Sequence, residues 1–180
     1  ADEFTGIAAD LSGPAISYTL LTNTTCLTDV TLDPVTITDG SGVNTTPGTK
    51  PRLYFKKSTD ANTYAGNTNA DNGWKYVEAS NAASPFSFTT NFALLQAAVA
   101  PGDVIQYFVV AQDNAGTPNV GINSGTFAST PASVALTAGA FPLTGTINSY
   151  NIAATLPTSI TIGAAGTYPT LTGVGGFFAA

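Results

Sequence analysis

The sequence predicts an all-β fold, an antiparallel β-sandwich of about seven to eight strands. Short runs rich in β-branched and aromatic residues recur along the chain, and Gly, Pro, Asn and Asp bound them. Helical signal is confined to "NFALLQAAVAPGD", where Asn91 can cap a turn or two before Pro101 and Gly102 end it. The absence of helical crossovers between these short strands indicates that they pair antiparallel.

The strands are expected in order along the chain, separated by turn residues. Six runs are well marked, and two later ones are less sharply bounded. The six are residues 14–20, 27–39, 51–57, 73–79, 84–90 and 103–113; the seventh lies within 120–137, and 145–154 is the eighth candidate.

Alternation assigns faces to these strands. In "RLYFKK", residues 52–57, odd-numbered side chains face one way and even-numbered ones the other, so we expect a core face and a wetted face. In "VIQYFVVA", residues 104–111, both faces are apolar apart from Gln106 and the Tyr107 hydroxyl, which indicates a central strand. This strand should leave the sandwich for a surface loop at Gln112. The residues expected to be buried are Phe55, Phe88, Val104, Phe108 and Val110.

The amino-acid composition argues against some classes of function. Only 9% of the residues are charged, against about 25% in typical domains, and the net charge is −6. The basic residues lie within one interval: Lys50, Arg52, Lys56, Lys57 and Lys75. An acidic chain with so few cations lacks the extended basic face that binds phosphate backbones, so nucleic acid is not an expected partner. No apolar run is long enough for a membrane span.

Catalytic groups are scarce, and we expect no enzyme activity. The chain has no histidine, which excludes a serine–histidine nucleophile, and the single Cys26 cannot form an intrachain disulfide. Most of the acids adjoin Gly, Asn, Thr or Pro in turns, where a carboxylate commonly caps the backbone. A compact sandwich rarely offers the deep cleft that a catalytic acid pair needs.

Three stretches carry a resemblance to a known family. "GPAISYTLL" from Gly13, "VTITDGSGV" from Val35 and "GDVIQYFVVAQDNAGTPN" from Gly102 resemble the immunoglobulin-like or fibronectin-III-like β-sandwich modules of large secreted or surface proteins of bacteria. The resemblance covers roughly residues 13 to 140 and implies an immunoglobulin-like sandwich. It also implies a secreted or cell-surface location and a non-catalytic structural, adhesive or assembly role in an extracellular protein. The expected partners are then other domains of the parent protein or neighbouring subunits.

The end of the chain resembles a different kind of region. "TSITIGAAGTYPTLTGVGGFFAA", residues 158–180, is similar to the opening of the repetitive parallel β-helix regions that follow such modules. We therefore divide the chain into an N-terminal extension (1–12), the sandwich (13–153) and a C-terminal segment (154–180), the truncated start of a following region. This segment is apolar and uncharged, so we expect it to dock, either within the chain or on a neighbouring molecule.

Aromatic residues suggest an alternative function. Trp74 and Tyr76 share one face of their expected strand, and Tyr54 is nearby in sequence. An aromatic platform flanked by polar side chains can stack sugar rings, which would make the chain a carbohydrate-binding module with glycans as partners. Aromatic side chains are also common packing partners on sheet faces. The sequence leaves both interpretations open.

Oxygen-rich loops suggest a structural calcium site at one end of the sandwich. Asp39 begins "DGSGVN", and Asp113 and Asn114 follow the central strand. Carboxylate and amide oxygens are the ligands that Ca²⁺ prefers, although the regular spacing of a helix–loop–helix site is missing. Capping of turns by the same side chains is the alternative. We expect no other cofactor.

Overall fold

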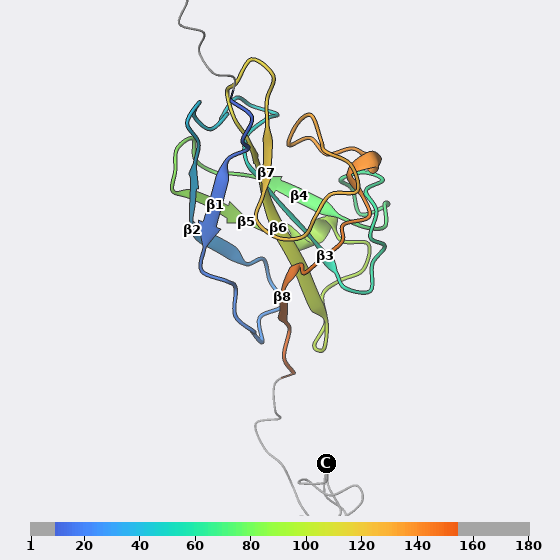
Figure 1. Cartoon of the computed structure of the whole chain (residues 1–180). Helices are drawn as coiled ribbons and strands as arrows, with labels where there is room; N and C mark the ends of the chain where they lie inside the picture. The colour runs from blue at the N-terminus through green and yellow to red at the C-terminus, as the bar shows by residue number, and fades with distance from the viewer. Residues whose placement is uncertain (1–9, 155–180) are drawn as a thin grey trace, which may run out of the picture.

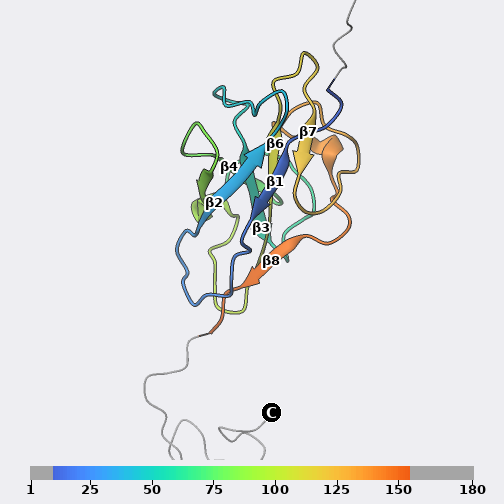
Figure 2. The same ribbon diagram turned by 60° about the vertical axis from the view of Figure 1, so that its left-hand side comes forward.

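The computed structural model describes residues 10–154, which form an all-β antiparallel sandwich of two sheets (Figures 1 and 2). The first sheet has the order β1-β2-β5, with bounds Ala15–Tyr18, Thr31–Thr38 and Phe86–Thr89. The second has the order β4-β3-β6-β7, and β8 also pairs with β6. Its bounds are Lys75–Glu78 (β4), Arg52–Lys57 (β3), Val104–Gln112 (β6), Val120–Ile122 (β7) and Asn148–Asn151 (β8).

Each of these strands lies inside one of the predicted ranges. The prediction of β6 as a central strand is confirmed, because β3 pairs along one side of it and β7 and β8 share the other. The predicted helical turn is a short 3₁₀ turn, Phe92–Leu94, and the Asn91 side chain accepts a hydrogen bond from the Ala93 N–H. A second 3₁₀ turn spans Ala138–Ala140.

The inner core lies between the two sheets. It forms because alternate side chains of each strand point toward the opposite sheet. Fully buried residues of this core come from four strands: Val35 and Ile37 of β2, Leu53 and Phe55 of β3, Phe86 and Phe88 of β5, and Ile105, Tyr107 and Val109 of β6. Val104, expected to be buried, is only half-buried, and its neighbour Ile105 takes the inward position.

A second apolar cluster covers the other face of the second sheet. Tyr54, Trp74 and Phe108 are fully buried there beneath Val134 and Phe141, which belong to the segment between β7 and β8. Figure 1 shows this segment, yellow to orange, folding back over β3 and β4. The expected wetted face is therefore wrong: every residue of β3 is buried. The predicted alternation of side chains along β3 is correct, but other parts of the chain cover both faces of the strand.

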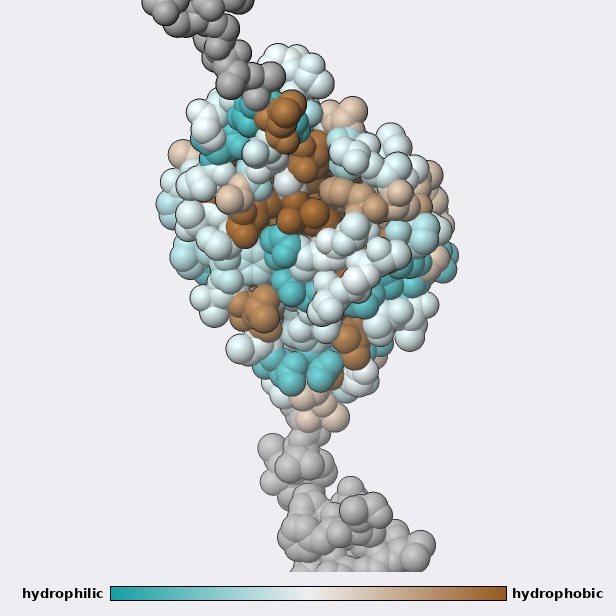
Figure 3. Space-filling model, viewed as in Figure 1, coloured by the Kyte–Doolittle hydropathy of each residue, from teal (hydrophilic) through white to brown (hydrophobic). Residues whose placement is uncertain are grey.

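The outer surface of this covering segment is mixed. Figure 3 shows an apolar area near β7 surrounded by polar residues. The half-buried side chains packed against the second cluster include Val120, Ile122, Phe127 and Ile147. Among the described residues, no helix is long and apolar enough to cross a membrane.

Buried cations hold the loop that joins β3 to β4. The Lys56 Nζ donates to the carbonyl oxygens of Lys57 and Asp60, both at 3.0 Å. The Lys75 Nζ donates to the carbonyls of Gly66 at 3.0 Å and Asp71 at 2.8 Å. Burial lowers the pKa of both amines. Because these ammonium groups bind backbone carbonyls, they order the loop rather than form a basic surface.

The other two buried cations form ion pairs. Arg52 lies 3.1 Å from the Glu78 carboxylate and 4.0 Å above the Tyr76 ring centre, and Lys57 lies 2.8 Å from Asp103. Two of the three cations of β3 are thus paired with carboxylates, and such a pair needs good geometry to offset its desolvation.

Candidate functional site

Three carboxylates meet at the end of the sandwich where the described chain begins. Asp10, Asp39 and Asp113 each place one carboxylate oxygen within 4.8 Å of the others. They come from three separate places: the stretch before β1, the turn after β2 and the end of β6. The structure therefore brings together two of the predicted calcium ligands, Asp39 and Asp113, and adds Asp10.

Local turn chemistry positions Asp39. Its Oδ1 accepts a hydrogen bond from the Ser41 N–H at 2.8 Å, and its carbonyl accepts from Gly42 N–H at 3.2 Å. Gly42 has φ +83°, which glycine adopts without the cost that a side chain would impose. The tight turn holds the Asp39 carboxylate at the end of β2.

Asp113 is fully buried, which differs from the surface loop expected after β6. Its Oδ1 accepts from the backbone N–H groups of Asn119 at 2.8 Å and Ala115 at 3.2 Å, and its Oδ2 accepts from Asn119 Nδ2 at 2.7 Å. Gln112 is also buried, and its Oε1 accepts from the Val134 N–H at 3.0 Å. The chain therefore turns inside the end of the sandwich.

Asp10 joins the cluster from a segment that the sequence assigned to an N-terminal extension. Its Oδ2 accepts from the Ser41 hydroxyl at 2.6 Å, and its carbonyl accepts from Asn119 Nδ2 at 3.1 Å. The hydrogen bond from Ser41, followed by that from the Ser12 N–H, lowers the pKa of Asp10. No pattern in the sequence singled out Asp10, because its partners Ser41 and Asn119 lie far from it along the chain.

The electrostatics of the cluster favour a cation. Like charges at this separation repel one another, and both salt bridges among the described residues lie elsewhere. Hard oxygen ligands at a separation of this order suit Ca²⁺, which takes about six to eight oxygens at 2.3–2.6 Å, some of them from backbone or water. Asp10, Asp39 and Asp113 are the side chains that could hold such an ion.

Asn114, the third predicted calcium ligand, holds the neighbouring loop. Its Nδ2 donates to the Val43 carbonyl at 3.3 Å, and its backbone N–H donates to the Gly42 carbonyl at 3.0 Å. Val43 also forms an isolated antiparallel bridge with Asp113. These contacts press the turn after β2 against the end of β6, which is what brings Asp39 and Asp113 together.

The predicted aromatic platform is not at the surface. Trp74 and Tyr54 are fully buried, and Tyr76 is half-buried beneath Arg52. Trp74 stacks against Phe141 with ring centres 6.3 Å apart. Because the covering segment occupies the faces that a sugar would need, the structure uses these rings for packing.

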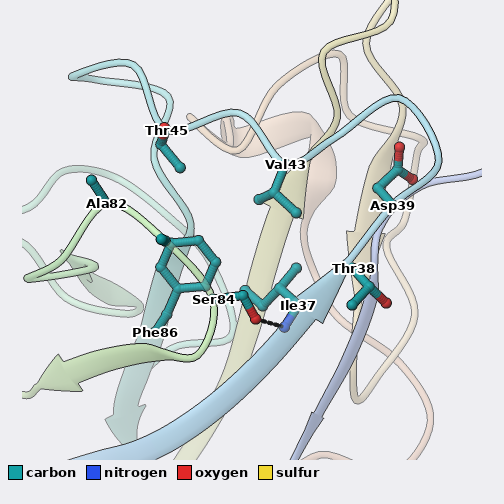
Figure 4. Close-up of a pocket in the computed structure, with 9 residues that line it drawn as sticks. Ile37, Thr38, Asp39, Val43, Thr45, Ala82, Ser84 and Phe86 are labelled. Carbon is teal, nitrogen blue, oxygen red and sulfur yellow. Dashed lines mark hydrogen bonds between the residues drawn. The ribbon is translucent and has the colours of Figure 1, made fainter.

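A pocket opens beside Asp39 (Figure 4). Its volume is about 340 Å³, and its lining mixes apolar side chains with hydroxyls: Ile37, Val43, Ala82, Ala83 and Phe86 with Thr38, Thr45 and Ser84. The Ser84 Oγ accepts a hydrogen bond from the Ile37 N–H at 3.0 Å. Asp39 supplies the one carboxylate of the lining, and Figure 4 shows it on the far side from Phe86 and Ala82. No local pattern in the sequence predicts this pocket.

The comparisons with known proteins do not assign the chain to a family. No protein-family model matches the chain, and no curated protein or solved structure matches it significantly. The resemblance to bacterial sandwich modules therefore stays a prediction from the motifs that carry it, and the fold is described from its own coordinates.

Proposed function

We propose that this chain is a non-catalytic structural, adhesive or assembly module of an extracellular bacterial surface protein. The observation that carries the proposal is the placement of its two ends. The described chain begins at one end of the sandwich and leaves at the opposite end (Figures 1 and 2). A module with this geometry can be inserted in line between other parts of a long protein and can separate them.

The first end is fixed to the fold. Ser41 and Asn119 hydrogen-bond to Asp10, as described above, and the chain then packs closely on β7. A Cβ added at Gly121 would overlap the carbonyl oxygen of Pro14, so the two backbones touch. Only glycine permits so close an approach. Tension applied at residue 10 is therefore passed directly to both sheets.

The second end is fixed equally well. The Thr24 N–H donates to the Asn151 carbonyl at 3.0 Å, and the Ala153 N–H donates to the Thr24 carbonyl at 2.7 Å. Ile152 is fully buried between them in the inner core. The exit of the chain is thus clamped by backbone hydrogen bonds and by an apolar anchor.

Mechanical unfolding by force spectroscopy tests the proposal. The full chain is pulled through handles attached at residues 10 and 154. We expect one cooperative event, because both ends are tied into the same core, with residues 10–154 adding roughly 500 Å of contour length at about 3.4 Å per residue. Unfolding in several small steps at forces near the noise would contradict the proposed role as a structural module placed in line within a long protein.

A second candidate function is calcium binding at the cluster of Asp10, Asp39 and Asp113. The convergence of their carboxylates favours it. Since Asp10 lies at the start of the described chain, an ion there would tie the incoming segment to β2 and β6. Glycan binding at Trp74 and Tyr76 is not proposed, because packing occupies those rings.

Thermal unfolding with and without calcium tests this candidate. Binding to the folded state adds about 2.7 kcal/mol when free calcium is about 100 times its Kd. Asp39→Asn should abolish this gain, and in chelator it should raise the melting temperature because one repulsive charge is removed. Asp33→Asn, an exposed acid of β2, is the matched control. Equal melting curves in millimolar calcium and in chelator would exclude the site.

A further inference from the structure

Both ends of the described chain are fixed at rest, but they meet tension with different strands. β1 is the first strand after the entry at residue 10, and β8 is the last before the exit at residue 154. In Figures 1 and 2, β1 runs from the entry end toward the opposite end, and β8 runs on toward the exit. A pull on the two ends therefore draws each strand along its own axis.

Such a pull loads the backbone hydrogen bonds of both strands in shear. β1 pairs antiparallel with β2 over residues 15–18, and β8 pairs antiparallel with β6 over residues 148–151. The hydrogen bonds of an antiparallel pair lie perpendicular to its strands, so sliding strains all the bonds of a ladder together. The strand with the weaker additional contacts should therefore slip first.

The exit strand is held on both sides. Toward β6, the Ile152 N–H donates to the Asp103 carbonyl at 2.8 Å. On the other side, the Asn151 N–H donates to Asn23 Oδ1 at 2.8 Å. Tyr150 and Ile152 are buried in the inner core. Sliding of β8 would thus break hydrogen bonds on two sides and displace two core side chains.

The entry strand is held differently. β1 has its ladder on the β2 side, while its other side lies along β7, a strand of the second sheet. Just before β1, the backbones of Gly13 and Pro14 touch Gly121 of β7. The side chains of β1 alternate between exposed and half-buried. Sliding of β1 would thus break one ladder without displacing a fully buried side chain of its own.

The far end of β1 is fastened by one hydroxyl. The Tyr18 hydroxyl accepts hydrogen bonds from Asn123 Nδ2 and, at 3.1 Å, from Asn148 Nδ2. Asn123 follows β7 and Asn148 begins β8, so this hydroxyl joins β1 to the second sheet. Ile16 and Tyr18 also pack on the inner core. Once β1 moves, water reaches that core and the remaining strands lose part of their support.

We propose that β1 is a mechanical latch. Tension along the chain shears β1 from β2 and β7 before β8 yields, and this step sets the force at which the module unfolds. The inference rests on the proposed structural role in line within a longer protein and deepens it. Forced unfolding is governed by the unfolding rate rather than by the equilibrium stability, so experiment can separate the two quantities.

Two engineered disulfides test the latch, both in a Cys26→Ser background. The entry disulfide, Ser17→Cys/Thr36→Cys, joins β1 to β2. The exit disulfide, Gln106→Cys/Ser149→Cys, joins β6 to β8. The residues of each pair lie directly opposite in the register, so their Cα atoms are about 4.5–5.5 Å apart, which suits a disulfide. All four side chains are exposed or half-buried, so the exchanges spare both cores.

Force spectroscopy on the full chain, with handles at residues 10 and 154, gives the first readout. We expect the entry disulfide to raise the unfolding force and to shorten the released contour length by about 60 Å, because residues 18–35 lie within its loop. The exit disulfide should shorten the contour length by about 140 Å, for residues 107–148, and leave the force unchanged. A reductant should restore the parent behaviour in both variants.

Urea unfolding of the same variants gives the second readout. A disulfide that closes a longer loop removes more entropy from the unfolded chain and stabilises the fold more at equilibrium. The exit disulfide should therefore raise the free energy of unfolding more than the entry disulfide, although only the entry disulfide raises the force. A general gain in stability would raise both quantities in the same order.

A force that the entry disulfide leaves unchanged, or that the exit disulfide raises as much, overturns the latch. If thiol titration shows that the entry disulfide does not form, two single variants decide. Tyr18→Phe should lower the unfolding force. Tyr150→Phe should not, because the Tyr150 hydroxyl has no hydrogen-bond partner among residues 10–154; equal forces in the two variants overturn the proposal.

Failure of the latch is distinguishable from failure of the proposed function. One cooperative event whose force ignores the entry disulfide overturns the latch alone and leaves the structural role standing. Several small steps near the noise contradict the structural role and the latch together.

Discussion

The rings of Tyr54 and Phe108 stack with centres 5.2 Å apart and planes 4° from parallel. They are direct partners in the β3–β6 register, on the face of the second sheet that points away from the first. This pair is the centre of the second apolar cluster. The second sheet is therefore packed on both faces, and its stability depends on the covering segment as well as on the partner sheet.

Replacing Phe108 by alanine should destabilise the fold by about 3–5 kcal/mol, the usual cost of truncating a buried phenylalanine. Phe108 is fully buried and also contacts Trp74 edge-on, with ring centres 4.8 Å apart. Urea unfolding measures the loss. The control is Leu11→Ala, an 84% exposed leucine, which should change the free energy of unfolding by less than about 0.5 kcal/mol. Equal effects of the two changes would refute the second core.

Removing only the hydroxyl of Tyr54 should also be costly. That hydroxyl donates to the Val134 carbonyl at 2.9 Å and accepts from the Leu136 N–H at 3.1 Å. Tyr54→Phe leaves both buried backbone groups without a partner, at a cost of about 1–3 kcal/mol. Tyr107→Phe is the control, because its hydroxyl serves only the half-buried Leu21 N–H. Hydrogen exchange at Leu136 should rise in the first variant alone.

The tyrosines predict loss of stability in alkali. Burial raises the pKa of Tyr18 and Tyr54 to about 12. Above about pH 10 the unfolded chain loses these protons while the folded protein keeps them. The unfolded state then binds fewer protons, so the free energy of unfolding falls as pH rises from about 10 to 12.

Urea unfolding across this range, with tyrosinate absorbance read in parallel, checks the alkaline prediction. Tyr18→Phe should make the fall shallower. Burial lowers the pKa of Lys56 and Lys75, which acts in the opposite sense, so the comparison with the variant isolates the tyrosine contribution. Titration of all tyrosines together near pH 10 in the folded protein would contradict the assignment.

The sequence was sufficient for the strands but not for what covers them. Local alternation of side chains, with Gly, Pro, Asn or Asp at the ends, predicts each strand. The strands at residues 52–57 and 104–112 could therefore be placed within a residue or two. The segment 127–147 has no such period. Its burial depends on a few separated apolar residues such as Val134 and Phe141, whose long-range partners no local pattern encodes.

The candidate site shows the same limit. Asp39 and Asp113 could be picked out because each follows a strand, and strand ends in a sandwich gather at its two ends. Asp10 could not, since its place depends on the close contact of residues 13 and 14 with Gly121. For Trp74 the sequence left a sugar-binding platform and packing on the sheet face both open, because no local pattern says what covers its strand; in the structure the covering segment packs on it.

Asn62 is the residue that ties three separate parts of the second core together. Its Oδ1 accepts from the Trp74 indole N–H at 2.9 Å and from the Leu143 N–H at 3.2 Å. Its Nδ2 donates to the Leu143 carbonyl at 2.8 Å. One amide therefore joins the loop after β3, the start of β4 and the covering segment.

We expect Asn62→Ala to cost about 1–3 kcal/mol for the buried donors and acceptor that it leaves unpaired. Trp74 is the single tryptophan, so its fluorescence reports this site alone, and the emission should shift to longer wavelength as water reaches the indole. Asn62→Asp separates the two roles: it keeps the acceptor for Trp74 but loses the donor to Leu143. It should therefore preserve the emission better than alanine while still loosening the covering segment. If both variants keep the parent emission and the parent unfolding curve, Asn62 does not hold the segment, and packing by Phe141 alone must do so.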